Sequence, residues 1–305
     1  MNVVGSRPRM PRRILLTGSS GQLGSELQRL SWLPDWQLVA ADRNNLDLSD
    51  TGAIQRMVNG ERWSAVINAG AFTGVDDAET RQVEAWQVNT LAPAALAQAC
   101  AQCDIPLVHV STDYVFPGTG ELPAQTDSIV GPLGVYGASK FGGELAVRAA
   151  GGTHAIIRTS WVISAHGKNF VRTMLRLARE RDFVRVVSDQ FGSPTSAKDL
   201  AEAIKTVLIG MCSEHPQVGG TFHFCNEGAT SWAMFAEEIF RQSAALGGPC
   251  ARVDPIATSD YPTAAERPKN SRLDCSKISE VYGLQPRPWQ LALTEILTEL
   301  IGSSE

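Results

Sequence analysis

The chain has no long apolar run and no excess of positive charge. None of its 305 residues lie in a window of about 20 continuous apolar residues, the length that a membrane-spanning helix needs. Its 27 Lys and Arg against 32 Asp and Glu leave a net charge of −5, which gives no general attraction to nucleic acid or to an anionic membrane. The first residues also lack the apolar segment of a signal peptide. These absences favour a cytoplasmic protein that binds a small molecule.

Cysteine and histidine are present, but without the spacing of a disulfide framework or a metal site. The six cysteines are scattered, as is usual in a reducing compartment, and Cys100 and Cys103 have a CxxC spacing. That pair ends an alanine-rich segment without a second pair, so small packed thiols are expected, with redox or metal chemistry as the alternative. The five histidines show no ligand spacing, and no metal ligand is predicted.

Short apolar runs alternate with segments long enough to hold helices through the first half of the chain. The runs predict strands at 13–17, 38–41, 65–68, 107–110 and 155–157. This alternation predicts an α/β fold with a Rossmann-type doubly wound parallel sheet. Beyond about residue 158 the pattern is less regular and predicts a smaller α/β lobe, with some segments returning to the sheet. The elements expected there are helices at 170–179 and from about 197, 232 and 289, and strands at 184–187 and 221–225.

A glycine turn follows the first predicted strand. Its G-x-x-G-x-x-G spacing stands directly before a helical pattern. Glycines at such a turn let the backbone approach a pyrophosphate whose charge lies over the helix N-terminus, and a plain tight turn is the alternative. We expect a tail at 1–12, a dinucleotide-binding domain at 13–160 and a mainly substrate-binding lobe at 161–305. The turn residues expected to bind the dinucleotide are Gly18, Gly21, Gln22, Leu23 and Gly24.

Residues after the second and third strands are further candidates for the same ligand. Asp42 lies about 20 residues past the glycines, where a carboxylate can accept hydrogen bonds from a ribose, and a capping or surface role is the alternative. Arg43 beside it is suited to a 2′-phosphate, which leaves NADH and NADPH both open as cofactors. The loop residues expected near the cofactor are Asp47 and Leu48 at the adenine, and Ala71, Phe72 and Thr73 after the third strand.

An acid–base pair, Tyr136 and Lys140, is spaced four residues apart on a predicted helix. That spacing places the phenol and the ammonium on one face of the helix. A charged lysine beside a tyrosine lowers the phenol pKa from about 10, so that it can exchange a proton with a reacting oxygen near neutrality. Thr112 ends the fourth strand, where its hydroxyl would face and polarise a substrate carbonyl. A surface pair and a strand-end cap are the alternatives.

These residues resemble the extended short-chain dehydrogenase/reductases, whose hydroxyl, Tyr and Lys triad occurs in this order. Within them, longer segments look like the dTDP-4-dehydrorhamnose reductase family. The resemblance implies NAD(P)H-dependent reduction of the C4 ketone of a dTDP-4-keto-6-deoxy-L-sugar, giving dTDP-L-rhamnose, so the expected partner is a dTDP-sugar. The segments span nearly the whole chain after residue 12: 14–18, 69–79, 111–118, 158–162, 169–170, 189–195 and 267–274.

The resemblance also implies a role for individual residues. Tyr136 would give its proton to the alkoxide, Lys140 would hold the nicotinamide ribose, and Thr112 would hydrogen-bond the C4 oxygen. Asp113 and Trp161 would line the sugar site, although Trp161 also suits a core position. The candidates for diphosphate and base contacts, with solvated loop charges as the alternative, are Arg267, Asn270, Ser271 and Arg272.

Two positions depart from the family pattern. Phe72 stands where relatives often carry His, close to the expected cofactor. Some relatives dimerise through Mg²⁺ held by acidic side chains. Glu26 and Glu299 would supply two such ligands, but Lys198 stands where a third acid is expected. A homodimer stays open, and a bridge through Mg²⁺ is doubtful.

Two other functions stay open at this point. The regulatory subunit of methionine adenosyltransferase resembles this family, so a non-catalytic NADP-binding subunit is one alternative. A sugar-nucleotide epimerase or dehydratase is the other, although such dehydratases place Glu after Thr-Asp, where this chain has Tyr114. The complete triad favours catalysis.

Overall fold

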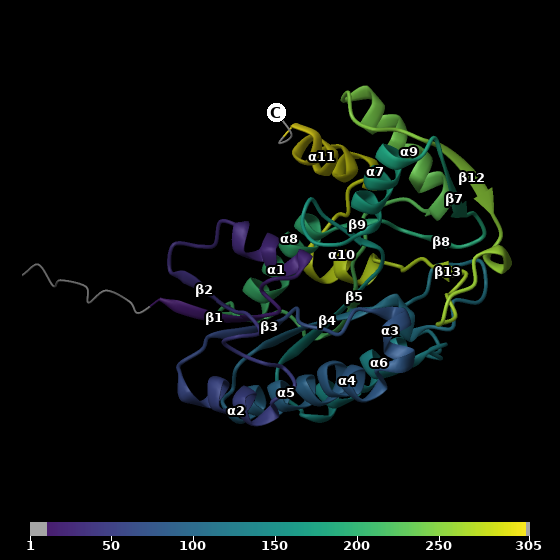
Figure 1. Ribbon diagram of the computed structural model, residues 1–305. Coiled ribbons are helices and arrows are strands. Elements are labelled where there is room, and N and C mark those ends of the chain that lie inside the picture. The colour runs from purple at the N-terminus through teal and green to yellow at the C-terminus, as the bar shows by residue number, and fades with distance from the viewer. Residues whose placement is uncertain (1–10, 303–305) are drawn as a thin grey trace, which may run out of the picture.

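A six-stranded parallel sheet lies at the centre of the protein, whose structure is a computed structural model that describes residues 11–302 (Figure 1). The strands run in the order β10-β5-β4-β3-β1-β2, and all neighbouring pairs are parallel. Most of the predicted tail lies outside the described residues, and Arg12 already belongs to the first strand. The strands are β1 (Arg12–Thr17), β2 (Trp36–Ala41), β3 (Ala65–Asn68), β4 (Leu107–Thr112), β5 (His154–Thr159) and β10 (Gly220–His223).

Helices cover both faces of this sheet. Side chains of neighbouring strand residues point to opposite faces, so Leu15 packs with one set of helices and Ile14 and Leu16 with the other. Burial on both faces explains why the strands are continuous apolar runs. One face carries α2 (Thr51–Gly60), α5 (Ala92–Gln102) and α6 (Val135–Ala149), and the other carries α1 (Gln22–Arg29), α8 (Ala197–Met211) and α10 (Ser276–Tyr282).

A smaller lobe with its own apolar core is built mainly from the second half of the chain (Figure 1). It contains α7 (Phe170–Glu180), α9 (Trp232–Ala245), α11 (Trp289–Gly302) and the parallel pair β7 (Phe183–Val187) and β12 (Arg252–Ile256). The remaining short strands are β6 (Val162–Ile163), β8 (Phe191–Gly192), β9 (Thr195–Ser196), β11 (Thr230–Ser231) and β13 (Asn270–Ser271). The remaining helices are α3 (Val75–Thr80), α4 (Gln82–Trp86), the π-helix η1 (Gln87–Leu91) and the 3₁₀ helices η2 (Asp113–Val115) and η3 (Thr258–Asp260).

The alternation of strands and helices predicted from the sequence is confirmed, and β10 and α8 return from the second half to the large sheet. The strand predicted at 221–225 begins one residue earlier and ends at His223. The sequence did not predict α10, β12, η3 or the short strands β6, β8, β9, β11 and β13. Pro255 within β12 lacks the N–H of a regular strand residue, which is tolerated because β12 pairs on one side only.

The order of the strands locates the binding crevice. The chain passes from β1 to β2 on one side and then to β3 on the other, so the loops after β1 and β3 diverge at the carboxyl edge of the sheet. Ligands of such sheets bind outside that edge, where the connections separate. Within residues 11–302, no helix is long and apolar enough to cross a membrane.

Candidate active site

The predicted glycine turn lies at this crevice, and close packing requires two of its glycines. Gly18 has φ +70°, and a Cβ atom there would lie 2.5 Å from the Cα of Gly70 in the loop after β3. A Cβ atom at Gly24 would lie 2.2 Å from the Gly18 carbonyl oxygen. The turn therefore brings bare backbone to the N-terminus of α1, as a pyrophosphate requires.

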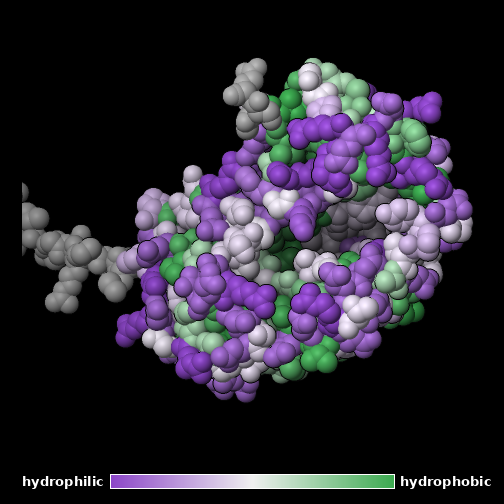
Figure 2. Space-filling model, in the orientation of Figure 1, coloured by the Kyte–Doolittle hydropathy of each residue, from purple (hydrophilic) through white to green (hydrophobic). Residues whose placement is uncertain are grey.

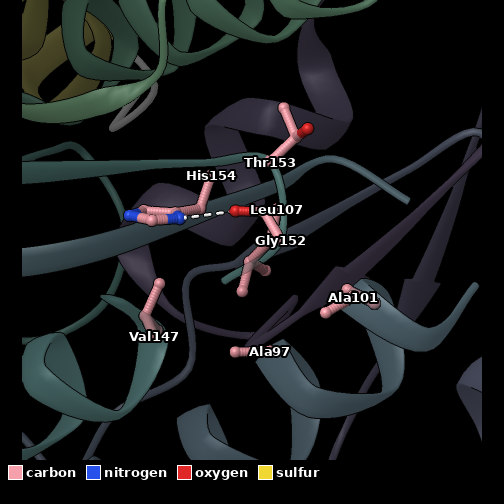
Figure 3. Close-up of a pocket in the computed structure, with 8 residues that line it drawn as sticks. Ala97, Ala101, Leu107, Val147, Gly152, Thr153 and His154 are labelled. Carbon is pink, nitrogen blue, oxygen red and sulfur yellow. Dashed lines mark hydrogen bonds between the residues drawn. The ribbon is translucent and has the colours of Figure 1, made fainter. Parts of the chain in front are cut away.

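The surface is hollowed between the large sheet and the smaller lobe, as Figure 2 shows. The cavity in Figure 3 lies elsewhere, at the amino ends of β4 and β5, where His154 Nδ1 is 2.8 Å from the Gly152 carbonyl oxygen. Its volume of about 10 Å³ leaves room for little more than one water. A groove of about 680 Å³ beside α7 is lined largely by basic side chains. Neither cavity includes a triad residue.

Thr112, Tyr136 and Lys140 come together at the carboxyl end of β4. The Thr112 hydroxyl donates to Asp113 Oδ1 at 3.0 Å and lies close enough to the Tyr136 phenol to affect its pKa. The Lys140 ammonium donates to the Val110 carbonyl oxygen at 2.7 Å. Helix α6 approaches η2 this closely because residue 137 is glycine, where a Cβ atom would lie 2.1 Å from the Tyr114 carbonyl oxygen. The middle of the Tyr-to-Lys motif thus has a packing function that its spacing alone does not reveal.

The pKa of Tyr136 differs from the sequence-based expectation. Burial raises the pKa to about 12, the nearby Thr112 hydroxyl acts in the opposite direction, and the charge of Asp113 raises the pKa further. The lowering expected from Lys140 is therefore wrong, because desolvation of the phenolate dominates. Burial also lowers the pKa of Lys140 to about 8, against the charge of Glu144. At neutral pH the phenol keeps its proton, which is the form that a proton donor needs.

Asp113 is buried beside the triad with an incompletely satisfied carboxylate. It is 4% exposed, and its Oδ2 has no hydrogen-bond partner among the described residues. Burial raises its pKa to about 6, while hydrogen bonds from Ser271 and Thr112 act in the opposite direction. Buried ionisable groups with shifted pKa values are common at functional sites.

Asp113→Asn is expected to stabilise the fold at neutral pH. The folded-state pKa of about 6 lies above the ordinary 3.8, so stability falls as pH rises through this interval. The cost of the carboxylate at pH 7.5 is on the order of 3 kcal/mol, and Asn removes it while keeping an acceptor for Thr112. Urea unfolding at pH 7.5 measures the change, with exposed Asp254→Asn as control. An unchanged or lower free energy of unfolding would show that the carboxylate is not destabilising.

The predicted adenosine contacts lie in the loops after β2 and β3. Asp42 Oδ1 accepts the N–H groups of Asn44 and Asn45 at 2.9 and 3.0 Å, so one oxygen already caps its loop. The Arg43 side chain is 83% exposed and lies 3.9 Å from Asp47. Leu48 covers Gly70, because a Cβ atom on that glycine would lie 2.4 Å from its side chain.

Asn89 positions the loop after β3 and was missed in the sequence. It is fully buried in η1, where a π-helix interrupts the regular helical pattern. Its amide accepts from the Phe72 N–H at 2.8 Å and donates to the Phe72 carbonyl and to Ser139 Oγ, both at 3.0 Å. Ser139 adjoins Lys140, so this side chain connects the predicted cofactor loop, Ala71 to Thr73, with the triad helix. The signal available in the sequence was a polar Asn89 within a largely apolar helical segment.

Trp161 belongs to an aromatic cluster of the smaller lobe. Its indole stacks on Trp232, with ring centroids 3.5 Å apart and 12° between planes. Gly192 makes room for it, because a Cβ atom there would lie 2.5 Å from the indole. Its φ of +48° is unusual for a non-glycine residue. Trp161 therefore packs against the core of the smaller lobe, which is the alternative role that the sequence left open.

The other predicted substrate residues have partners from distant segments. Arg267 donates to Asp76 Oδ2 at 2.6 Å. The Asn270 amide donates to the carbonyls of residues 120 and 122 at 3.1 and 2.8 Å, and its Oδ1 accepts from Arg272. Ser271 is 3% exposed and lies close enough to Asp113, beside the triad, to lower the pKa of that carboxyl.

The acids considered for Mg²⁺ have basic neighbours. Glu26 and Glu299 lie close together, but Arg29 stands 3.8 and 2.8 Å from them and His166 stands 3.5 and 3.7 Å from them. Lys198 pairs instead with Glu295 at 2.9 Å. No group of three or more His, Cys, Asp or Glu among the described residues is arranged to hold a metal.

Comparison with known proteins identifies the family. Residues 12–301 match the family model of the RmlD substrate binding domain. The chain belongs to this family. The dTDP-4-dehydrorhamnose reductase of Sinorhizobium fredii (strain NBRC 101917 / NGR234) is 38% identical over 290 residues, 95% of this chain and 98% of that protein. That of Escherichia coli (strain K12) is 38% identical over 297 residues, covering 95% and 99%.

A family member of known structure has the same fold. The crystal structure of dTDP-4-dehydrorhamnose reductase from Bacillus anthracis str. Ames in complex with NADP has a TM-score of 0.88 at 33% identity, covering 95% of this chain and 100% of that one. The family resemblance inferred from the sequence is therefore confirmed over both the large sheet and the smaller lobe.

Proposed function

We propose that this protein is an NAD(P)H-dependent reductase that converts dTDP-4-dehydro-β-L-rhamnose into dTDP-L-rhamnose in dTDP-rhamnose biosynthesis. The convergence of Thr112, Tyr136 and Lys140 at the carboxyl end of β4, beside the glycine turn, carries this proposal. Membership of the family over residues 12–301 supports the choice of substrate.

The side chains suit proton delivery to a ketone oxygen. A reduced nicotinamide, when bound, supplies the hydride for C4. The Thr112 hydroxyl lies beside the Tyr136 phenol, so both can face one carbonyl oxygen and polarise it. Tyr136 then gives its proton to that oxygen. Lys140 in its charged form would stabilise the phenolate left behind, and its ammonium would be available to the nicotinamide ribose when the cofactor is bound.

We assign the dinucleotide to residues 13–160 and the sugar nucleotide mainly to 161–305. The backbone cradle at Gly18 and Gly24, which a Cβ atom would fill, supports the first assignment. The proximity of Ser271 to Asp113 supports the second, because it brings a residue of 161–305 beside the triad. Within that lobe, Trp161, Arg267 and Asn270 are proposed to contact the substrate together with these two.

We infer that the nicotinamide preference depends on Asp42 and Arg43. Asp42 offers its second oxygen to a ribose, and the exposed Arg43 offers a cation to a 2′-phosphate. The NADP complex of the Bacillus anthracis relative supports NADPH, and NADH stays an alternative.

Turnover of the purified protein tests the proposed function. With the 4-keto sugar nucleotide, we expect NADPH or NADH to be oxidised and dTDP-L-rhamnose to be identified by mass spectrometry and NMR. If neither cofactor is oxidised, the non-catalytic regulatory subunit replaces the reductase as the better hypothesis. A protein that retains its nicotinamide through purification and shows no net oxidation would instead be an epimerase.

We also propose that activity needs no bridging Mg²⁺, since Arg29 and His166 already accompany Glu26 and Glu299. Excess EDTA is expected to leave the turnover rate and the native mass unchanged, and the same native mass shows whether a homodimer forms. Loss of activity or of mass with EDTA, restored by added Mg²⁺, would contradict this expectation.

A further inference from the structure

A buried carboxylate, Glu144, lies one helical turn beyond Lys140 and is saturated with hydrogen bonds. It is fully buried in α6. Its Oε1 accepts from Ser111 Oγ at 2.6 Å and from Arg158 Nε at 2.8 Å. Its Oε2 accepts from Arg158 Nη2 and Arg148 Nη2, both at 2.7 Å. The proposed mechanism above gives no task to this cluster.

The cluster connects the elements that carry the triad. Ser111 directly precedes Thr112 on β4, and Arg158 is its register partner on β5. Arg158 is 1% exposed and its guanidinium also lies 4.8 Å from the centre of the Phe116 ring. Glu144 therefore attaches α6, with Tyr136 and Lys140, to the strand ends beside the reacting oxygen.

Glu144 also sets the charge around Lys140. Burying an ammonium is costly unless an opposite charge compensates it, and Glu144 is the acid whose charge favours protonated Lys140. The π-helix η1 adds only neutral side chains near the lysine, and α5 has no charged residue. The charged or titratable groups near α6 also include Asp113 and Tyr114 on η2, His109 on β4, Arg158 on β5, Tyr136 and Arg148 on α6 itself, Glu79 at the first turn of α6, and the exposed pair Arg81 and Glu84.

We propose that Glu144 is a positioning residue that holds α6 against β4 and β5 and keeps Lys140 charged during turnover. This inference rests on the proposed reductase function. It predicts that variants changing the local charge move the alkaline limb of the pH–rate profile in opposite directions. A role in packing alone would lower the rate of every variant without moving the limb.

The test compares the pH dependence of kcat for three variants. Glu144→Gln removes the compensating charge and is expected to move the alkaline limb down by about one pH unit. Arg148→Gln removes a competing cation whose side chain is 34% exposed, and a smaller upward shift of roughly half a unit is expected because solvent screens it. The double variant is expected to lie between them. The same change on α9, Arg241→Gln, is the control and leaves the limb in place.

A second readout needs no turnover. Lys140 loses its proton more easily in the folded than in the unfolded state, so stability rises with pH across that interval. The rise in the urea midpoint is expected to begin at lower pH in Glu144→Gln and at higher pH in Arg148→Gln. An inactive parent would refute the reductase, and these midpoints would still decide whether Glu144 controls the charge of Lys140. If Glu144→Gln does not fold, the pH–rate profile and urea midpoints of Arg148→Gln, a change at a half-exposed side chain, test the proposal by themselves. Identical pH profiles in parent and variants overturn the proposal.

Discussion

Tyr136→Phe is expected to lower kcat at least about 10²-fold while nicotinamide binding is retained. The substitution removes the proton donor but leaves the ring that packs edge-on against Tyr114, with centroids 5.4 Å apart. The phenol, with a pKa near 12, is fully protonated at working pH, so its loss removes the acid rather than a charge. Steady-state kinetics together with cofactor titration by fluorescence separates the catalytic defect from a binding defect.

The matched control for this prediction is Tyr261→Phe, whose side chain is 57% exposed and which is expected to leave kcat unchanged. Wild-type turnover in Tyr136→Phe would show that another group donates the proton. Asp113, with its pKa near 6, is the neighbouring acid that would do so, and it would reveal itself by activity that falls as pH rises through 6.

Lys140→Met is expected to lower kcat/KM by at least about 10²-fold and to abolish the alkaline limb of the residual activity. The pKa of Lys140 near 8 means that the parent has full activity below that pH and loses it above, as the ammonium becomes neutral. Tyr136 does not account for this limb, because its pKa is far higher. The pH–rate profiles of parent and variant check this assignment.

The same variant is expected to be more stable than the parent. The folded-state pKa of Lys140 lies below its ordinary 10.5, so burying the charged lysine costs up to about 3 kcal/mol below pH 8, and this cost vanishes above pH 10.5. Urea unfolding at both pH values measures the difference. Lys205→Met on α8, where the lysine has a surface partner, is the control. A variant that is inactive and also less stable at pH 7 would contradict this account.

Local patterns in the sequence were sufficient to predict the fold class and to propose Thr112, Tyr136 and Lys140 as a group. Strands that are buried on both faces are mostly apolar, so the apolar runs in the strands that end at Thr17 and Thr112 predicted a parallel sheet. The spacing of Tyr136 and Lys140 is a property of one helix, and it survived in the structure unchanged. Gly18 and Gly24 were recognisable because a backbone turn acts only on residues near it in the chain.

Residues whose function depends on partners far away in the chain could not be identified from the sequence. Asn89 and Glu144 read as ordinary polar residues of helices, although each is fully buried and connects separate segments. Arg267 was assigned to a diphosphate from the resemblance, and the structure pairs it with Asp76, 191 positions away. Such pairings form only when the sheet and the smaller lobe close on each other.

The sequence by itself determined which chemical groups are available: a backbone cradle for a dinucleotide, a hydroxyl at a strand end, and a phenol and an ammonium on one helical face. Only the tertiary structure decided their protonation. The phenol keeps its proton and the lysine holds its charge weakly, because packing removes both from water and desolvation is the largest cause of both pKa shifts. The burial of Tyr136 and Lys140 depends on the packing of the whole fold, whereas their spacing can be seen in five consecutive residues.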